Sequence, residues 1–262
     1  QGAWLSGNDS DADNNNQIDE LIRLANEYDD IIVAVNLGNE IFVDWSYHKF
    51  TVEQIPMYLA WVEKVKSAVK APVTLADDYN FYNKPWSEQI TAQLDFIVLH
   101  AYAMWNSQTL ENAVPWTAQV YADIQSRHPT KQIALGESGW ATSSIKSNGD
   151  ERLIIAEASE EAQAAFFNEY RVWLQQNHIA SFYFEAFDEP WKDAANAYGS
   201  ENHFGLFTVD GKAKYALWDL VDQGVFAGLT RGGNPITKTF EGEIMALKKT
   251  VSLPPMQTVL HR

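Results

Sequence analysis

The chain has 262 residues, a length compatible with one α/β barrel domain, and its 35 acidic and 19 basic residues give a formal net charge of −16. That charge argues against a polyanionic partner such as nucleic acid or an anionic membrane surface. Cysteine is absent, which excludes disulfides, thiolate metal sites and thiol catalysis, and no apolar run approaches the roughly 18 residues that a membrane helix needs.

Short apolar runs alternate with longer stretches of helical spacing along the chain. The runs predict strands at residues 3–5, 31–36, 73–76, 96–100, 132–135 and 181–184. Between them, apolar spacing and capping residues predict helices at residues 16–27, 51–69, 87–93, 110–127 and 159–177. Continuous apolar strands that alternate with helices are typical of a parallel sheet covered on both faces, so the predicted fold class is α/β.

The alternating pattern stops near Thr230. Residues 231–235 contain glycine and proline, and the remaining chain has a Pro254–Pro255 pair and little periodicity. We therefore expect one catalytic domain over residues 1–229 and an irregular tail or linker over residues 230–262.

One acidic segment near the N-terminus resembles a calcium-binding loop. Asp9, Asp11, Asp13 and Glu20 have the ligand spacing of an EF-hand. Asn14 stands where that loop needs glycine, and the chain before Asp9 is too short for the preceding helix. We favour a polar loop whose asparagines cap the next helix, with a calcium site as the alternative.

Acidic and aromatic side chains follow most of the predicted strands. In parallel α/β proteins, ligands and catalytic groups gather at the carboxyl ends of the strands. The residues in those places are Asn39, Glu40, Asp77, Asp78, Tyr79, His100, Tyr102, Trp105, Glu137, Trp140, Glu185, Asp188, Glu189, Trp191 and Lys192. We expect them to lie on one rim of the sheet.

Glu40 and Glu137 stand out among these residues. Each follows an apolar strand, where a charge is costly unless function requires it. Two carboxyl groups that face each other across a sugar are the minimal equipment of a glycosidase, one as general acid/base and one as nucleophile or base. The alternative is that both are exposed loop acids, but the asparagine before Glu40 and the glycine and tryptophan around Glu137 favour the catalytic interpretation.

Three phrases occur in a distinctive order: LGNE at residues 37–40, GESGW at residues 136–140 and FYFEAFDEPWK at residues 182–192. Together they resemble glycoside hydrolase family 17 in its bacterial form. This family contains β-1,3-glucanases and glucanosyltransferases and belongs to the clan A retaining glycosidases. The resemblance covers about residues 2–220 and implies an eight-stranded TIM-type (β/α) barrel.

The resemblance also implies roles for individual residues. Glu40 matches the acid/base and Glu137 the nucleophile of the family. Asn39 matches the residue that hydrogen-bonds the sugar 2-hydroxyl, and Tyr102 the tyrosine that hydrogen-bonds the nucleophile. The alternative for Tyr102 is a packed aromatic ring whose hydroxyl is satisfied elsewhere.

Further substrate contacts are expected from charged and aromatic residues. Glu189 and Lys192 match a charged pair that orients the sugar and the catalytic acids, with a surface salt bridge as the alternative. We expect an indole face to stack on glucose at Trp105, Trp140 and Trp191. The alternative for each of them is packing alone.

Two acids and a histidine complete the set of candidates. Asp77 and Asp78 either line the cleft or cap the loop that follows them. His100 is expected to be a hydrogen-bonded neighbour of the site rather than a catalytic base, and with no second histidine near it in sequence a zinc site is not expected.

The sequence departs from the family at its start. Six strand–helix units are visible, and the first two units of the family have no counterpart, nor does the arginine that the second strand brings near the nucleophile. We expect the sequence to be part of a longer chain. The alternatives are a barrel that closes differently and a second copy that supplies the missing edge; otherwise we expect a monomer.

The leading hypothesis is therefore a retaining glycoside hydrolase that acts on β-1,3-glucan of the laminarin type. A β-1,3-glucanosyltransferase with the same site, or a catalytically impaired glucan-binding protein, is the alternative. No metal or organic cofactor is expected, because carboxylates fill both chemical roles, and the partner is a polysaccharide or oligosaccharide. No leader pattern opens the sequence, and the resemblance implies an extracellular or periplasmic location.

Overall fold

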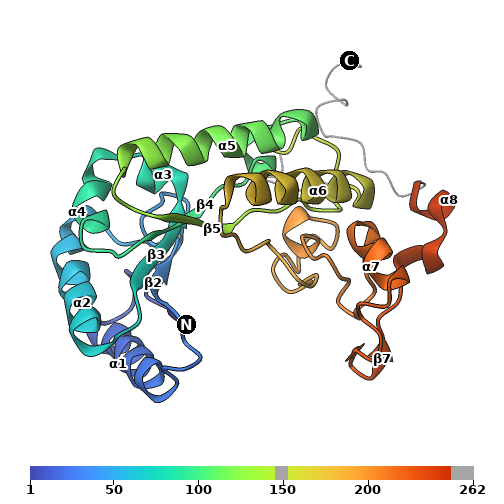
Figure 1. The fold of residues 1–262 in the computed structure, drawn as a ribbon. Helices are drawn as coiled ribbons and strands as arrows, with labels where there is room; N and C mark the ends of the chain where they lie inside the picture. Colours follow the sequence, from blue (N-terminus) through green and yellow to red (C-terminus); the bar gives the residue numbers. More distant parts are fainter. Residues whose placement is uncertain (145–152, 249–262) are drawn as a thin grey trace. The chain divides into compact units, whose positions relative to one another are not determined.

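A computed structural model describes residues 1–144 and 153–248 (Figure 1). The chain divides into two compact units. Unit 1 contains Gln1–Ala101 and Gln119–Gly136, and unit 2 contains Tyr102–Ala118 and Glu137–Arg262. None of the described helices combines the length and apolar character needed to cross a bilayer.

Unit 1 is built on a five-stranded sheet with the order β1-β2-β3-β4-β5. The strands are β1 (Gly2–Ala3), β2 (Val35–Asn39), β3 (Val73–Asp78), β4 (Ile97–His100) and β5 (Ile133–Glu137). The pairs β1/β2, β2/β3 and β3/β4 are parallel. Every residue of β3 is buried, as expected for a central strand of a parallel sheet that is covered on both faces. The predicted α/β class is therefore confirmed.

Helices lie between these strands and are coloured blue to green in Figure 1. They are α1 (Asp11–Glu27), α2 (Ile55–Ala68), α3 (Tyr79–Tyr82), α4 (Glu88–Thr91) and α5 (Leu110–Arg127), with short 3₁₀ turns η1 (Val52–Gln54), η2 (Pro85–Ser87) and η3 (Met104–Asn106). The predicted helix at residues 110–127 coincides with α5. Helix α3 was not predicted, because a single turn is too short to show periodicity.

The second strand begins later than its apolar run suggests. Residues 31–34 are not part of β2, and the backbone N–H groups of Ile31 and Ile32 donate to the Tyr28 carbonyl in a turn. The side chains of Ile31 and Val33 are exposed. The chain is thus still completing the end of α1 where the sequence predicted a strand.

The acidic segment near the N-terminus is helical. Helix α1 begins at Asp11 and includes Glu20, so the EF-hand spacing does not form a calcium loop. The N-cap is Ser10, whose hydroxyl accepts a hydrogen bond from the Asp13 backbone N–H at 3.2 Å. The prediction that asparagines cap this helix is therefore wrong, and a serine serves instead.

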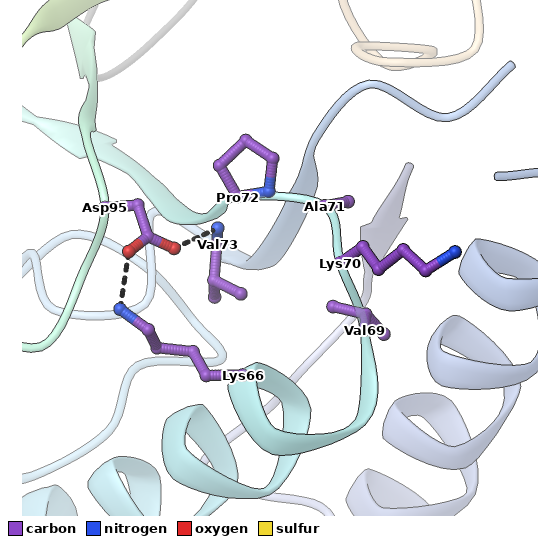
Figure 2. A pocket seen from close by; sticks show the side chains of 7 residues that line it. All are labelled: Lys66, Val69, Lys70, Ala71, Pro72, Val73 and Asp95. Carbon is purple, nitrogen blue, oxygen red and sulfur yellow. Dashed lines mark hydrogen bonds and ion pairs between the residues drawn. The ribbon is translucent and has the colours of Figure 1, made fainter. Parts of the chain in front are cut away.

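Asp95 connects helix α2 to the amino end of strand β3. Its carboxylate lies 2.5 Å from Lys66 Nζ and accepts from the Val73 backbone N–H at 2.8 Å (Figure 2). A pocket beside this contact is lined by Lys66, Val69, Lys70, Ala71, Pro72, Val73 and Asp95. It lies at the opposite end of β3 from Asp77 and Asp78, so it is separate from the predicted rim.

Unit 2 packs around helix α6 (Glu160–Asn177), whose N-cap Ser159 accepts from the Ala162 backbone N–H. The remaining elements are α7 (Trp218–Asp222), β6 (Thr230–Arg231), β7 (Asn234–Pro235), α8 (Ile244–Leu247) and the turns η5 (Ser200–Asn202), η6 (Tyr215–Leu217) and η7 (Thr239–Gly242). Its fully buried aromatic residues are Trp140, Phe166, Tyr170 and Phe204.

A buried polar network stabilises the second half of unit 2. Lys214 Nζ lies 2.7 Å from Asp188 Oδ1, and the Lys214 side chain is almost fully buried. The Glu160 carboxylate accepts from the Tyr215 backbone N–H and from the Thr239 hydroxyl. Thr239 lies in the predicted tail, so the tail is hydrogen-bonded to helix α6 at this residue. Residues 249–262, with Pro254 and Pro255, lie outside the described residues.

The predicted strand at residues 181–184 does not form a regular strand. Ser181 is part of an isolated bridge, and the Phe184 backbone N–H donates to the Ser138 carbonyl. The backbone groups of Glu185 bond with Phe204 and Leu206. These bonds run to different segments, so they do not build a continuous ladder with one neighbour.

Candidate active site

Glu40 follows the last residue of strand β2 in a sharp backbone turn. Its φ is 51°, in the left-handed region that non-glycine residues seldom adopt, and Gly38 before it has a φ of 100°. The Glu40 backbone N–H donates to the Ala76 carbonyl at 2.9 Å. This turn places a partly exposed carboxyl group at the carboxyl end of the sheet, as the sequence predicted for an acid at a strand end.

Three buried polar residues lie around Glu40 within unit 1. His100 Nδ1 lies 3.1 Å from Glu40 Oε1, and the imidazole is only 1% exposed. Asp77 accepts from the backbone N–H groups of Phe42, at 2.9 Å, and of Asp78, at 2.8 Å. Asp78 caps helix α3 by accepting from the Asn80 backbone N–H at 2.8 Å. The capping alternative therefore applies to Asp78.

The two aspartates have raised pKa values. Burial raises the pKa of Asp77 to about 8, and the nearby Glu40 adds to this effect while the two backbone N–H groups oppose it. Burial likewise raises the pKa of Asp78 to about 7. Perturbed carboxyl groups of this kind concentrate at functional sites, where they are candidates with a physical rationale.

Asp77 was a candidate to line the cleft and contact substrate, and the structure corrects that expectation. Its side chain is 0% exposed, and its two oxygens are taken up by the backbone N–H groups of Phe42 and Asp78. Asn39, by contrast, is partly exposed, and its backbone carbonyl oxygen accepts from His48 Nε2 at 2.8 Å. Ser46 Oγ lies 3.0 Å from the other ring nitrogen of His48. His48 was not singled out in the sequence, because nothing in its neighbours indicates a contact with Asn39.

Glu137 is the last residue of strand β5, and within unit 2 it is held by a tyrosine. The Tyr102 hydroxyl donates to Glu137 Oε2 at 2.8 Å. The Tyr102 ring has edge contacts with Phe184 and Phe204, both at 5.7 Å between ring centroids. The hydroxyl of Tyr102 is thus aimed at the carboxylate by packing on two sides, which is the contact that the sequence resemblance implied.

Lys192 joins two glutamates on the loop that follows residue 184. Its Nζ lies 3.1 Å from Glu189 Oε2, 3.2 Å from Glu185 Oε2 and 4.0 Å from the centroid of the Phe184 ring. Burial raises the pKa of Glu185 to about 7, and the Lys192 ammonium opposes that rise. The sequence assigned no role to Glu185, although its position directly after an apolar run was a signal.

The three tryptophans that were candidates for stacking on sugar differ in exposure. Trp191 is 70% exposed, and Trp105, in turn η3, is partly exposed. Trp140 is 0% exposed: its indole N–H donates to the Glu157 carbonyl and its ring packs on Phe166 at 5.4 Å. Trp140 therefore presents no face to a sugar, which corrects the expectation for this residue.

Known proteins that are similar to this chain include glycosidases and transferases that act on β-1,3-glucan. A crystal structure of an endo-laminarinase from Formosa Hel1_33_131 superposes with a TM-score of 0.84 at 34% identity, over 97% of this chain and 77% of that chain. A β-1,3-glucanosyltransferase from Rhizomucor miehei, solved as an active-site mutant with laminaritriose, has a TM-score of 0.65 at 24% identity, over 81% of this chain and 73% of that chain; it supports the fold alone.

Sequence relatives and a family model agree with this result. A glucan 1,3-β-glucosidase of Arthroderma benhamiae is 27% identical over 211 residues, which cover 76% of this chain and 65% of the relative. The chain thus spans slightly less than two thirds of that relative. The model of the BtgE/BtgC glycoside hydrolase domain matches residues 1–205. The chain therefore belongs to the BtgE/BtgC glycoside hydrolase domain family, and the prediction that it belongs to a glycoside hydrolase family is confirmed.

Proposed function

We propose that the protein is a retaining glycoside hydrolase of the family 17 type that cleaves β-1,3-glucan. The observation that carries this proposal is the hydrogen bond of 2.8 Å from the Tyr102 hydroxyl to Glu137, the glutamate of the phrase GESGW. The similar proteins include an endo-laminarinase and a glucan 1,3-β-glucosidase, which supports the substrate class.

In the proposed reaction, two carboxyl groups act in two steps. Glu137, ionised, attacks the anomeric carbon while Glu40 donates a proton to the leaving oxygen, giving a covalent glycosyl-enzyme. Glu40 then removes a proton from water, which attacks the anomeric carbon and releases Glu137. This double displacement requires the carboxyl groups to come within about 5 to 5.5 Å of each other when substrate is bound.

Substrate binding is proposed to use groups that the structure leaves accessible. Asn39 hydrogen-bonds the 2-hydroxyl, a contact that strengthens as the oxocarbenium-like transition state forms. Trp191 and Trp105 provide indole faces for the CH-rich face of glucose. Lys192 and Glu189 orient a sugar and fix each other through their ion pair at 3.1 Å.

The architecture around this site is proposed to be the eight-stranded barrel of the family. The first two units would then come from chain that precedes Gln1 and would pair with strand β1, which stands at the edge of the sheet. We propose that residues 1–229 belong to this domain and that the segment after them is joined to it through the hydrogen bond from the Thr239 hydroxyl to Glu160. A polysaccharide substrate also implies an extracellular or periplasmic location.

Digestion of laminarin tests the proposal. The wild-type protein should release new reducing ends, Glu137→Gln should lose nearly all activity, and NMR of the first product should show the β-anomer. An α-anomer as first product would exclude retention. No cleavage by the wild type, with binding of laminari-oligosaccharide seen by calorimetry, would favour a glucan-binding protein.

The same reaction separates hydrolysis from transfer. A covalent intermediate can be intercepted by a sugar hydroxyl instead of water, so a glucanosyltransferase would form products longer than the donor. Chromatography of the products from a single laminari-oligosaccharide distinguishes these outcomes without a change in the assigned carboxylates.

A further inference from the structure

The backbone at Glu40 is strained and must be held in place. A glutamate with a φ of 51° occupies a left-handed conformation that persists only when surrounding contacts over-determine it. Two hydrogen bonds donated by backbone N–H groups secure this turn. Glu40 N–H donates to the Ala76 carbonyl, and Phe42 N–H, two residues later, donates to the Asp77 side chain.

The carboxyl group of Asp77 holds this turn in place. Its two carboxylate oxygens accept from different backbone groups: Oδ2 from Phe42 at 2.9 Å and Oδ1 from Asp78 at 2.8 Å. The side chain is 0% exposed, so it is not available to a substrate. A fully buried carboxyl group is costly, and here it connects the carboxyl end of strand β3 to the turn that carries Glu40.

His100 holds the side-chain carboxyl group of Glu40. Its Nδ1 lies 3.1 Å from Glu40 Oε1. The ring itself is fixed from behind, because strand β5 approaches it closely at a glycine: a Cβ on Gly136 would lie 2.9 Å from His100 Cδ2 and 3.0 Å from Nε2. The imidazole therefore has little freedom to rotate away from Glu40.

We propose that Asp77 and His100 are positioning residues for Glu40, Asp77 through the backbone at Phe42 and His100 through the carboxyl group. The inference rests on the proposed function, in which Glu40 is the acid/base. Both side chains are buried, so neither is exposed to the reacting sugar. Their loss should impair proton donation to the leaving oxygen and leave the attack of Glu137 largely intact.

Two substrates with different leaving groups separate these steps in the full chain. The bond in a laminari-oligosaccharide needs a proton on its leaving oxygen, whereas dinitrophenolate leaves a dinitrophenyl β-laminaribioside without one. The value kcat/KM reports formation of the glycosyl-enzyme for both substrates. The ratio of the two kcat/KM values thus measures the contribution of the general acid alone.

Asp77→Asn is the first variant. An amide nitrogen cannot accept a hydrogen bond, so one of the two backbone N–H groups loses its partner. We expect kcat/KM for the laminari-oligosaccharide to fall about 10- to 100-fold, part of the roughly 10²- to 10⁴-fold that a general acid contributes, and kcat/KM for the dinitrophenyl substrate to change less than about threefold.

Asp78→Asn is the matched control. Asp78 is the neighbouring buried carboxyl group of the same strand, but it caps helix α3 and does not bond to the Glu40 turn. Any loss of activity in this variant should be the same for both substrates. Thermal denaturation of each variant shows whether folding alone explains a loss.

Two substitutions of His100 provide a second test that does not depend on Asp77. His100→Leu removes the nitrogen beside Glu40, whereas His100→Asn keeps a polar atom near the position of Nδ1. The leucine variant should lose activity selectively on the laminari-oligosaccharide, and the asparagine variant should recover part of it.

Glu40→Ala distinguishes failure of this inference from failure of the proposed function. If Glu40→Ala shows the selective loss but Asp77→Asn and His100→Leu do not, the positioning role is overturned and the function stands. If Glu40→Ala lowers both kcat/KM values equally, or the wild type cleaves neither substrate, the acid/base assignment itself is wrong. If Asp77→Asn does not fold, the two His100 variants decide whether Glu40 depends on positioning residues.

Discussion

At the scale of single residues, each candidate catalytic glutamate has a partner from the strand-end region of its own unit. The Tyr102 hydroxyl donates to Glu137, and the His100 imidazole lies beside Glu40. Hydrogen-bonded partners of this kind fix the rotamer of a side chain before substrate arrives, which reduces the reorganisation that catalysis requires.

The contact between Tyr102 and Glu137 can be tested by removing one oxygen atom. Hydrogen bonds to charged groups contribute about 1.5 to 3 kcal/mol, so Tyr102→Phe should lower kcat/KM about 10- to 100-fold. Because Glu137 attacks the sugar whatever the leaving group, the loss should be similar for a laminari-oligosaccharide and a dinitrophenyl laminaribioside. Tyr121→Phe, which removes a hydroxyl that donates to the Ile133 carbonyl, is the control and should retain activity.

The raised pKa of Asp77 predicts a dependence of stability on pH. The folded protein holds this proton up to a pKa of about 8, whereas the ordinary value is 3.8, so between these values the folded state binds more protons than the unfolded state. The free energy of unfolding should therefore decrease as pH rises through this window, by up to about 1.4 kcal/mol per pH unit for this group.

Asp77→Asn should reduce that slope, because the amide does not titrate. Urea denaturation of the wild type and the variant at pH 5 and pH 8 measures the difference. Equal slopes for the two proteins would show that Asp77 has the same pKa in the folded and unfolded states.

At the scale of elements, the loop after strand β5 is constrained by close backbone approach. A Cβ on Gly139 would lie 1.9 Å from the Phe184 carbonyl oxygen and 3.2 Å from the Phe204 ring. Phe184 and Phe204 are also the two rings that pack against Tyr102. The glycine after Glu137 thus lets the chain of residue 184 approach closely enough to orient Tyr102.

Gly139→Ala should therefore destabilise the protein by about 2 kcal/mol or more, since the blocking atom is backbone and cannot rotate away. The midpoint of urea denaturation measures this effect. Gly2→Ala is the matched control, because the nearest atom to its Cβ would be 3.8 Å away, and its stability should change by less than about 0.5 kcal/mol. A neutral Gly139→Ala would contradict the packing seen around this loop.

At the scale of the whole molecule, the net charge of the protein disfavours anionic substrates and leaves neutral ones unaffected. A net charge of −16 repels polyanions, whereas a glucan is uncharged. Binding through indole faces and hydroxyl contacts does not depend on ionic strength in the way that ion pairing does.

The KM for laminarin should accordingly change less than about twofold between low salt and about 0.5 M salt, where the Debye length is only a few ångströms. A carboxymethylated β-glucan is the matched comparison: its KM should be higher at low salt and should fall as salt is added. A KM for laminarin that rises steeply with salt would indicate that charge attraction drives binding.

Much of the fold and of the candidate site could be predicted from local patterns. The helix at residues 110–127 was predicted at its observed bounds because its apolar periodicity is long and uninterrupted. The strands that end near Asn39, His100 and Glu137 were predicted because their apolar runs stop at a polar residue. The predicted strand at 181–184 does not form, because the backbone bonds of Phe184 and Glu185 run to two different segments rather than to one neighbouring strand.

The sequence by itself determined the α/β class and the membership of a glycoside hydrolase family, and it singled out the carboxyl groups proposed to perform the chemistry, because these depend on residue type and order along the chain. Only the tertiary structure decided which side chains remain accessible. Asp77 and Trp140 have the residue types of a sugar site, yet Phe42 and Asp78 enclose the first and Glu157 and Phe166 the second. Burial is decided by such distant neighbours, and no local pattern around either residue specifies them.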